Sequence, residues 1–382
     1  MHIPMDYMTL RVIWWGLLGV LLIGFAIADG FDLGVAALLP FVARTDGERR
    51  MVINTIGATW EGNQVWLILL GGAIFAIWPA VYATLFSGLY IAMMLVLFSL
   101  FLRPAGFDYR SKIDCPKWRN AWDWALFLGG TLPPVLLGVL VGNLLIGLPF
   151  HLDEDLRPNY DGSFFGLLGP FQLLCGVIGV VLTSFHGGIF IKWRTDGDVR
   201  ERARKAVSFL GPVLIALVAV AALWLIFGFD RPELTSIAGK GAPSNPMNKA
   251  VLAKGPGWLA HFLENPWMLV APVVAVLGLL FAWILGRGRG DASAFVLSSL
   301  GIVGALLTIG FGLFPFLLIS TVDPRSSLTL WDATSSHMVL NIAFWITIVF
   351  LPIVLLYTQW VYRKLWGTVS NDSILQNTHT LY

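Results

Sequence analysis

The chain has 382 residues, of which 57% are hydrophobic and only 13% are charged, and its mean hydropathy is +0.76. Soluble domains carry about 25% charged residues, so this composition excludes an ordinary soluble protein and indicates a polytopic membrane protein. The formal net charge of +2 does not indicate a nucleic-acid partner, because the basic residues are divided among many connections. The two cysteines, Cys115 and Cys175, form no CxxC or CxxCH motif and predict no disulfide framework.

Nine apolar segments are long enough to cross a bilayer as helices, for which about 20 apolar residues suffice. The first would form about 48 Å of helix, so we expect it to tilt or to project from the hydrocarbon layer. It follows no basic region and is too long for a signal peptide, so it should stay uncleaved. The nine segments are residues 10–41, 52–77, 79–102, 121–145, 164–191, 206–228, 267–285, 293–318 and 338–362.

The fold class that follows is an all-α polytopic membrane protein, with residues 1–382 in a single integral membrane domain. We expect helices 1–4 in residues 10–145, helices 5–6 in 164–228, an outer loop over 229–266, helices 7–9 in 267–362 and a cytoplasmic tail over 363–382. Connections on one side hold 18 of the 25 Lys and Arg residues, and those on the other side hold 7. Because cytoplasmic loops carry the excess of Lys and Arg, the sequence predicts a periplasmic N-terminus and a cytoplasmic C-terminus.

The motif Trp60-Glu61-Gly62-Asn63-Gln64-Val65-Trp66 puts a carboxyl group and two amides in the second apolar segment. Counting from Val52, Glu61 lies about 13 Å along a helix, which is deep in a hydrocarbon layer of about 30 Å. A charge there costs roughly 2.5–3.5 kcal/mol, so Glu61 is a functional candidate and should face protein. A buried acid can pass a proton, with Asn63 and Gln64 fixing the carboxyl group or holding water. The alternative is a neutral acid hydrogen-bonded between helices, and Trp60 and Trp66 are expected to be packing or interface residues.

The first segment carries two acids, Asp29 and Asp32, whose spacing of three places them on one face of a helix. Asp29 lies about 28 Å from Leu10 along that helix, near the cytoplasmic edge of the apolar layer. One interpretation is a water-accessible acidic entry for protons or cations. The other is structural, with the acids capping a helix or pairing with Arg or Lys from an inner loop. The small residues Gly30 and Gly34 beside them would permit close helix packing.

Two polar stretches lie at the ends of apolar segments. Residues 103–110 follow the third segment and include Arg103, Asp108 and Tyr109, a mixture of charges that indicates solvated ion pairs and interfacial anchoring. Residues 329–336 precede the last segment, and Asp332 with Ser335 and Ser336 predicts helix N-capping. A contact with a partner at the outer face is the alternative for this second stretch.

The sequence predicts no metal site and no catalytic residue in this chain. Only two of the six histidines, His186 and His337, lie at membrane segments, and the topology puts them on opposite sides, so no bis-histidine haem pair is available. A His/Met haem stays open because nine Met residues are scattered along the chain. Copper centres need clustered His or Cys, and the sequence shows neither such a cluster nor a nucleotide-binding GxxxxGK[ST] or GxGxxG motif.

Along essentially its whole length the sequence resembles subunit II of cytochrome bd-type quinol oxidases. Glu61 stands where many members of that family have Asp, and Thr59 stands where some have His, so the carboxyl group is kept while its neighbouring network differs. The matching stretches occur in order and are Ile13-Trp14-Trp15, Asp29 to Gly34, Trp60 to Trp66, Arg103-Pro104 with Gly106 to Arg110, Trp331 to Ser336 and Thr378 to Tyr382.

The resemblance implies a complex in the bacterial cytoplasmic (inner) membrane. Its subunit I would carry haems b and d and the quinol site, and subunit II would pack beside it in a pseudo-symmetric arrangement of nine helices. Together they would oxidise quinol at the outer face and reduce O2 to water with protons from the cytoplasm. The resemblance also implies a proton route near the acid of the Trp60–Trp66 motif, sometimes a structural quinone or lipid in subunit II, and small single-helix accessory subunits.

The leading hypothesis is therefore a haem-free oxidase subunit that supplies a proton path and a large helical interface. A secondary transporter that uses Asp29, Asp32 and Glu61 as cation sites is the alternative, although transporters tend to show internal repeats and broken helices. A third hypothesis is an assembly scaffold whose acids are inert. The expected proton path consists of Asp29, Asp32, Glu61, Asn63 and Gln64, and the expected structural or partner-facing residues are Trp60, Trp66, Arg103, Asp108, Tyr109, Asp332 and Ser335.

Overall fold

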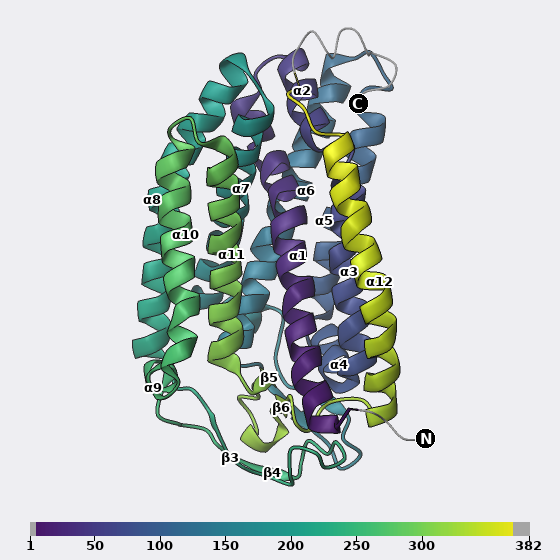
Figure 1. Cartoon of the computed structure of the whole chain (residues 1–382), viewed down its shortest axis with the longest axis vertical. Helices are drawn as coiled ribbons and strands as arrows, with labels where there is room; N and C mark the ends of the chain where they lie inside the picture. The colour runs from purple at the N-terminus through teal and green to yellow at the C-terminus, as the bar shows by residue number, and fades with distance from the viewer. Residues whose placement is uncertain (1–4, 370–382) are drawn as a thin grey trace.

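The computed structural model describes residues 5–369, and this part of the chain is a bundle of long, roughly parallel and antiparallel helices (Figure 1). The long helices are α1 (Tyr7–Val42), α3 (Trp60–Ile77), α5 (Tyr90–Tyr109), α6 (Pro116–Ile146), α7 (Pro170–Arg194), α8 (Gly197–Gly228), α10 (Val270–Gly286), α11 (Asp291–Leu313) and α12 (His337–Lys364). The short helices are α2 (Asp46–Ile56), α4 (Pro79–Gly88) and α9 (Trp258–Glu264), with 3-10 turns η1 (Phe165–Leu167), η2 (Pro266–Leu269) and η3 (Pro324–Ser326).

Within the described residues, nine helices are long and apolar enough to cross a membrane, counting α10 together with the preceding turn η2. The prediction of an all-α polytopic membrane protein with nine spans is confirmed. The end of the bundle with α2 and the α7–α8 and α10–α11 connections holds most of the basic residues, and we call it the basic end (Figure 1). Helix α1 begins at the opposite end and α12 finishes at the basic end, as an odd number of spans requires. That the basic end faces the cytoplasm stays a prediction.

Helix α1 contacts α2, α3, α6, α7, α8, α11 and α12, and its residues 29–39 are buried inside the bundle. Its closest neighbour is α7, against which Gly34 packs without any side chain between the backbones. A Cβ atom at Gly34 would lie 1.8 Å from the carbonyl oxygen of Thr183, and one at Gly187 would lie 2.6 Å from the carbonyl carbon of Gly34. The expectation of close helix packing at Gly34 is therefore confirmed, and it fixes the acids of α1 inside the bundle.

Four of the expected segments have wrong boundaries, and one of them, 164–191, becomes an α-helix only at Pro170, after the turn η1. Residues 52–77 are two helices, because the chain breaks at residues 57–59 between α2 and α3, and residues 79–102 lie in α4 and α5, with a break at Leu89. The segment over 293–318 ends as a helix at Leu313, and β5 (Phe316–Leu318) follows Pro315. A residue that precedes proline is disfavoured in the helical region, which explains this last boundary.

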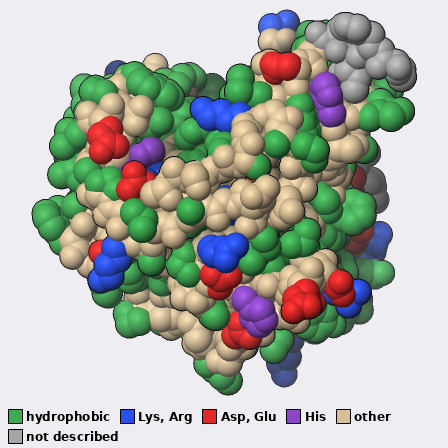
Figure 2. Space-filling view, turned by 90° about the horizontal axis from the view of Figure 1, so that it is seen from below, with side chains coloured by type: hydrophobic (Ala, Val, Ile, Leu, Met, Phe, Trp, Pro, Cys, Tyr) green, Lys and Arg blue, Asp and Glu red, His purple; other side chains and the backbone are tan. Residues whose placement is uncertain are grey.

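The other end of the bundle, which we call the hairpin end, is covered by irregular chain and three two-stranded antiparallel sheets. The expected outer loop 229–266 forms the hairpin of β3 (Glu233–Ile237) and β4 (Lys249–Leu252) and then α9. The other strand pairs are β1 (Phe150–Leu152) with β2 (Pro158–Tyr160) and β5 with β6 (Leu328–Thr329). Figure 2 shows this end from below, with charged side chains of both signs scattered over backbone and polar residues.

Candidate functional site

Two fully buried side chains, Asp29 on α1 and Arg103 on α5, form an ion pair inside the bundle. The guanidinium group donates two hydrogen bonds, from Nη1 to Oδ2 at 3.0 Å and from Nη2 to Oδ1 at 2.7 Å. This bidentate geometry is the strong form of an arginine–carboxylate contact. Asp29 thus pairs with an arginine, as one interpretation expected, but this arginine comes from the last two turns of α5 and not from an inner loop.

Asp32 lies one turn further along α1 and is also fully buried. Its Oδ2 accepts a hydrogen bond from Nδ2 of Asn63 at 2.7 Å and lies 3.9 Å from Nη2 of Arg103. Its Oδ1 has no hydrogen-bond partner among the described residues. Two carboxyl groups therefore share one guanidinium group, and one carboxyl oxygen is left unsatisfied. Both acids are fully buried, so the expected entry open to water is not present among the residues that the structure describes.

The polar cluster continues to the last helix through Tyr362, whose hydroxyl donates to Oδ1 of Asn63 at 2.8 Å. The cluster therefore connects α5, α1, α3 and α12 by side chains that are distant in sequence. We call Asp29, Asp32, Asn63, Arg103 and Tyr362 the buried cluster. Tyr362 was not among the expected site residues, because its role depends on how α12 packs and no local pattern marks it.

Helix α3 presents two different faces. Trp60, Asn63 and Trp66, spaced by three, are buried and point toward α1 and α5. Trp60 packs on Phe107 with ring centroids 5.0 Å apart, and its ring centroid lies 5.8 Å from the Arg103 guanidinium carbon. The expectation that both tryptophans are packing residues is confirmed, and their packing aims Asn63 at Asp32.

Glu61 lies on the opposite face of α3 and is exposed on the surface of this chain. The expected depth of Glu61 is wrong, because α3 begins at Trp60 and the acid sits in its first turn instead of deep along a helix from Val52. Gln64 is partly buried, and neither side chain has a described hydrogen-bond partner. Glu61 and Gln64 are therefore not brought into the buried cluster, although Asn63 is.

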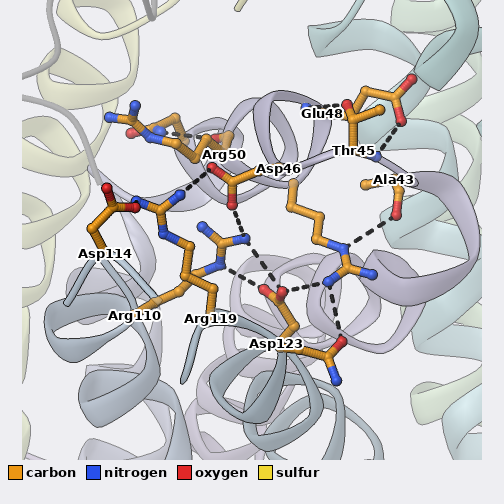
Figure 3. Close-up of polar contacts among 12 residues, drawn as sticks. Ala43, Thr45, Asp46, Glu48, Arg50, Arg110, Asp114, Arg119 and Asp123 are labelled. Atoms are coloured by element: carbon orange, nitrogen blue, oxygen red, sulfur yellow. Dashed lines mark hydrogen bonds and ion pairs between the residues drawn. The ribbon is translucent and has the colours of Figure 1, made fainter. Parts of the chain in front are cut away.

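The basic end is closed by α2, an amphipathic helix whose first turn carries a capping box between Thr45 and Glu48. Its apolar residues pack with Trp60 and Phe107 in one core cluster. Its polar side takes part in an ion network around Asp123 of α6, which is bound by Arg49 at 2.7 Å and by Arg110 at 2.6 Å (Figure 3). Asp46 of α2 joins the network through Arg110 and Arg119. These ion pairs attach α2 to α6 and to the end of α5, so α2 stays over the end of the bundle.

The other residues expected after the third segment lie at the surface. Asp108 and Tyr109 are exposed, and the Tyr109 carbonyl accepts a hydrogen bond from Nε1 of Trp118 at 2.8 Å. Tyr109 also stacks on Trp122 at 6.0 Å between ring centroids. Solvated ion pairs were expected here, but Asp108 is exposed with no ion pair in the described part of the chain, and Arg103 forms its ion pair fully buried because the helix continues through Pro104. Interfacial anchoring by Tyr109 stays a prediction.

At the hairpin end, Ser336 is the N-cap of α12, and its side chain accepts a hydrogen bond from the Val339 amide. N-capping is confirmed for Ser336 but wrong for the other two residues. Asp332 accepts from the Thr329 amide and pairs with Lys249 at 3.0 Å, and the Ser335 hydroxyl donates to the Ala76 carbonyl. Burial raises the pKa of Asp332, and the positive charge of Lys249 partly offsets this rise. Burial also lowers the pKa of Lys249, and the negative charge of Asp332 partly offsets this fall.

Four of the six histidines lie in the described part of the chain, and one of them is inside the bundle. The imidazole of His186 is fully buried, with Nδ1 2.7 Å from Oγ of Ser298 and Nε2 3.3 Å from the carbonyl oxygen of Ile27. Its ring stacks on Phe295 at 4.6 Å. Both ring nitrogens of His186 are thus engaged. His151, His261 and His337 lie at the hairpin end, and the expectations that concern His2 and His379 fall outside the described residues.

The fold and the buried cluster define a polytopic α-helical membrane protein that holds titratable side chains inside its bundle. The chain belongs to the cytochrome bd terminal oxidase subunit II family, whose family model matches residues 10–365. It is therefore a subunit of a bd-type terminal oxidase, and the family resemblance found in the sequence is confirmed. The matching stretch Thr378 to Tyr382 lies outside the described residues.

Similar proteins cover nearly the whole chain. It is 48% identical over 377 residues to a protein of Escherichia coli strain K12 named cytochrome bd-I ubiquinol oxidase subunit 2, covering 99% of this chain and 100% of that protein. It is 31% identical over 360 residues to cytochrome bd ubiquinol oxidase subunit 2 of Bacillus subtilis, covering 93% and 96%. A chain of the bd oxidase structure from Geobacillus thermodenitrificans shares the fold, with a TM-score of 0.67, 20% identity, and coverage of 91% and 97%.

The family implies haem in the complex, but His186, the histidine buried within a membrane span, does not fit a haem-iron site. His186 has no free ring nitrogen, and no group of three or more His, Cys, Asp or Glu side chains is gathered in the described part of the chain. No step is therefore assigned to a haem held by this chain.

Proposed function

We propose that this chain is the haem-free subunit of a bd-type quinol oxidase in the bacterial inner membrane. With a haem-bearing subunit I it would oxidise quinol and reduce O2 to water, and it would contribute a path for protons from the basic end. Family membership supports the complex and its reaction. The hydrogen bonds on both ring nitrogens of His186 support placing the haems in the partner.

The observation that carries the proton path is the charge balance of the buried cluster. Asp29 and Asp32 share Arg103, and all three side chains are fully buried. If both acids were ionised, the cluster would hold an uncompensated negative charge out of contact with water, which is costly. Because Arg103 binds Asp29 through two hydrogen bonds, the proton that removes this charge belongs on Asp32, whose Oδ1 is free to carry it.

The neighbours of Asp32 indicate which side the proton uses. Asn63 holds Oδ2, and the Tyr362 hydroxyl extends the polar chain to the last turns of α12 at the basic end. The Tyr362 hydroxyl can donate and accept a proton, whereas Asn63 positions its neighbours. In this proposal Asp32 is the acid that exchanges the proton, and Asp29 holds Arg103 in place.

Glu61 is the second acid of the proposed path. It is exposed in this chain in the first turn of α3, where a charged acid that faced hydrocarbon would be unfavourable. We therefore propose that this face of α3 lies against subunit I, where Glu61 would meet polar groups of the partner. The exposed apolar residues on the same face, Val65 and Ile68, suit such an interface.

The test uses the assembled complex with Asp32→Asn or Glu61→Gln in this chain. Both variants should slow O2 reduction and charge separation in proteoliposomes while the haem spectrum and haem content stay unchanged. Asp114→Asn is the matched control, because Asp114 is an acid at the same end with a side chain that is 95% exposed. Normal turnover and charge separation in both Asp32→Asn and Glu61→Gln would remove these acids from the path.

An assembly role is favoured for Asp29 alone. Its carboxyl group is saturated by Arg103, so it joins α1 to α5 and has no free oxygen for a transferred proton. Asp29→Asn should therefore lower the yield of assembled, haem-containing complex more than it lowers turnover per haem. The reverse result would assign Asp29 to the path.

A further inference from the structure

A cavity of about 370 Å³ lies at the basic end, between the α7–α8 connection and the α10–α11 connection. We infer that this cavity binds the phosphate-bearing headgroup of an acidic phospholipid. Five basic side chains line it together with one acid, and they are Lys192, Arg200, Arg204, Arg287, Arg289 and Glu201. We call this cavity the headgroup site.

Charges within the headgroup site do not balance. The Asp291 carboxylate binds both Lys192 and Arg200, the latter at 2.6 Å, and Glu201 binds Arg204 at 2.6 Å. Five cations thus meet two anions. Arg287 and Arg289 have no carboxylate within ion-pair distance in the described part of the chain, and Arg287 only stacks on the ring of Trp283 at 5.0 Å. An excess of guanidinium groups facing one cavity favours a phosphate diester.

The headgroup site lies at the level where lipid headgroups are expected. Helix α10 ends at Gly286, so Arg287 and Arg289 follow directly on a membrane span, and the apolar part of α8 starts after Lys205. Between the two helices, Nε1 of Trp283 donates to the Ser208 carbonyl at 3.1 Å. Tryptophan is enriched at membrane–water interfaces, so Trp283 marks the boundary of the hydrocarbon layer next to this site.

Apolar surface for acyl chains continues from the same site into the membrane. Phe209 of α8 is 70% exposed, and Phe281 and Ile284 of α10 are also exposed. A soluble anion would use the basic side chains alone, whereas a phospholipid would use both the basic side chains and this apolar surface. Basic pockets between transmembrane helices are suited to acidic lipid headgroups. The combination therefore indicates a lipid of the leaflet at the basic end.

The test measures lipid binding to the assembled, detergent-solubilised complex by native mass spectrometry, with phosphatidylglycerol and phosphatidylcholine as probes. The Arg287→Gln/Arg289→Gln double variant breaks no ion pair, so folding should be kept. We expect the wild-type complex to prefer phosphatidylglycerol, and the double variant to bind it about thirtyfold more weakly, at ~1 kcal/mol for each basic side chain. Lys112→Gln/Lys117→Gln is the matched control, because both lysines are exposed at the same end and line no part of the site.

Three results would overturn the inference. The first is unchanged phosphatidylglycerol binding in the Arg287→Gln/Arg289→Gln variant. The second is an equal loss in the Lys112→Gln/Lys117→Gln variant, which would mean attraction to a diffuse basic surface. The third is displacement of phosphatidylglycerol by millimolar inorganic phosphate, which would mean a site for a soluble anion. None of these results depends on turnover, so they are independent of the proton path.

Discussion

Arg103 is the residue whose replacement tests the buried cluster most directly. Its guanidinium group neutralises Asp29 through two hydrogen bonds and lies 3.9 Å from Asp32, and all three side chains are fully buried. Removing one partner of a buried ion pair costs about 3–5 kcal/mol, because the remaining charge is left without compensation. Arg103→Met leaves the Asp29 carboxylate in this state, so we expect the free energy of unfolding to fall by ~5 kcal/mol, the upper end of the range.

Asp29→Asn should lower the free energy of unfolding by less than Arg103→Met does. The amide can still accept one hydrogen bond, and Arg103 keeps Asp32 nearby, so we expect a loss of ~3 kcal/mol, the lower end of the range. The double variant Arg103→Met/Asp29→Asn should lose less stability than Arg103→Met alone, because it leaves no buried carboxylate without its partner. This corresponds to a coupling energy of at least ~3 kcal/mol, at the upper end for residues in contact.

The assay is denaturant titration of the assembled complex, followed by tryptophan fluorescence, with the haem spectrum as a control for assembly. Phe101→Ala serves as a reference, since Phe101 is on α5 but 55% exposed. Strictly additive losses in the double variant would refute the reasoning, because they would show that Arg103 and Asp29 do not depend on each other in the folded complex.

Three further predictions concern other contacts. Gly34→Ala should cost at least ~3 kcal/mol in the same titration, because its Cβ atom would overlap the Thr183 carbonyl, while Gly16→Ala in open space should stay within ~0.5 kcal/mol. Tyr362→Phe should cost ~1 kcal/mol and slow O2 reduction, and Tyr357→Phe, at an exposed site, should do neither. Partial burial raises the pKa of Glu48, but the Arg44 amide and the Arg202 side chain outweigh it, so the pKa lies below its ordinary value of 4.5. Ionised Glu48 therefore stabilises the complex at pH values above 4.5, and this stabilisation should be lost as the pH falls through the lowered pKa. In thermal denaturation at different pH values, a Glu48→Gln complex should lack this acid-dependent loss of stability.

The sequence was sufficient to predict the nine spans, because each is a nearly continuous apolar run that has no other stable place than a membrane or a large core. It also placed Asp29 and Asp32 on one helix face and offered an arginine as their partner. It did not identify which arginine. The apolar run stops at Leu102, which put Arg103 in a loop, yet α5 continues through Pro104 to Tyr109. Helix termini set by tertiary packing are not visible in hydropathy alone.

The break between α2 and α3 was missed for a different reason. Residues 51–56 are apolar enough to join the following segment, but they belong to an amphipathic helix that lies across the end of the bundle. The capping box at Thr45 and Glu48 was a readable sign of a helix start at that point. Tyr362 had no such sign, because it meets Asn63 across 299 positions of sequence.

Helix α12 is attached to the rest of this chain mainly at its two tips. Near one tip His337 stacks on Tyr7 and contacts the Met5 carbonyl, and near the other Tyr362 reaches Asn63, while Leu340 is its only buried residue. Between its ends α12 is mostly exposed and makes few contacts with this chain, such as that of Leu351 with the cluster of Phe25 and Trp66, so this stretch can bend to match a surface that lies opposite. Amide hydrogens in the middle of α12 should accordingly exchange faster once the neighbouring subunit is stripped away, whereas those of α1 should not.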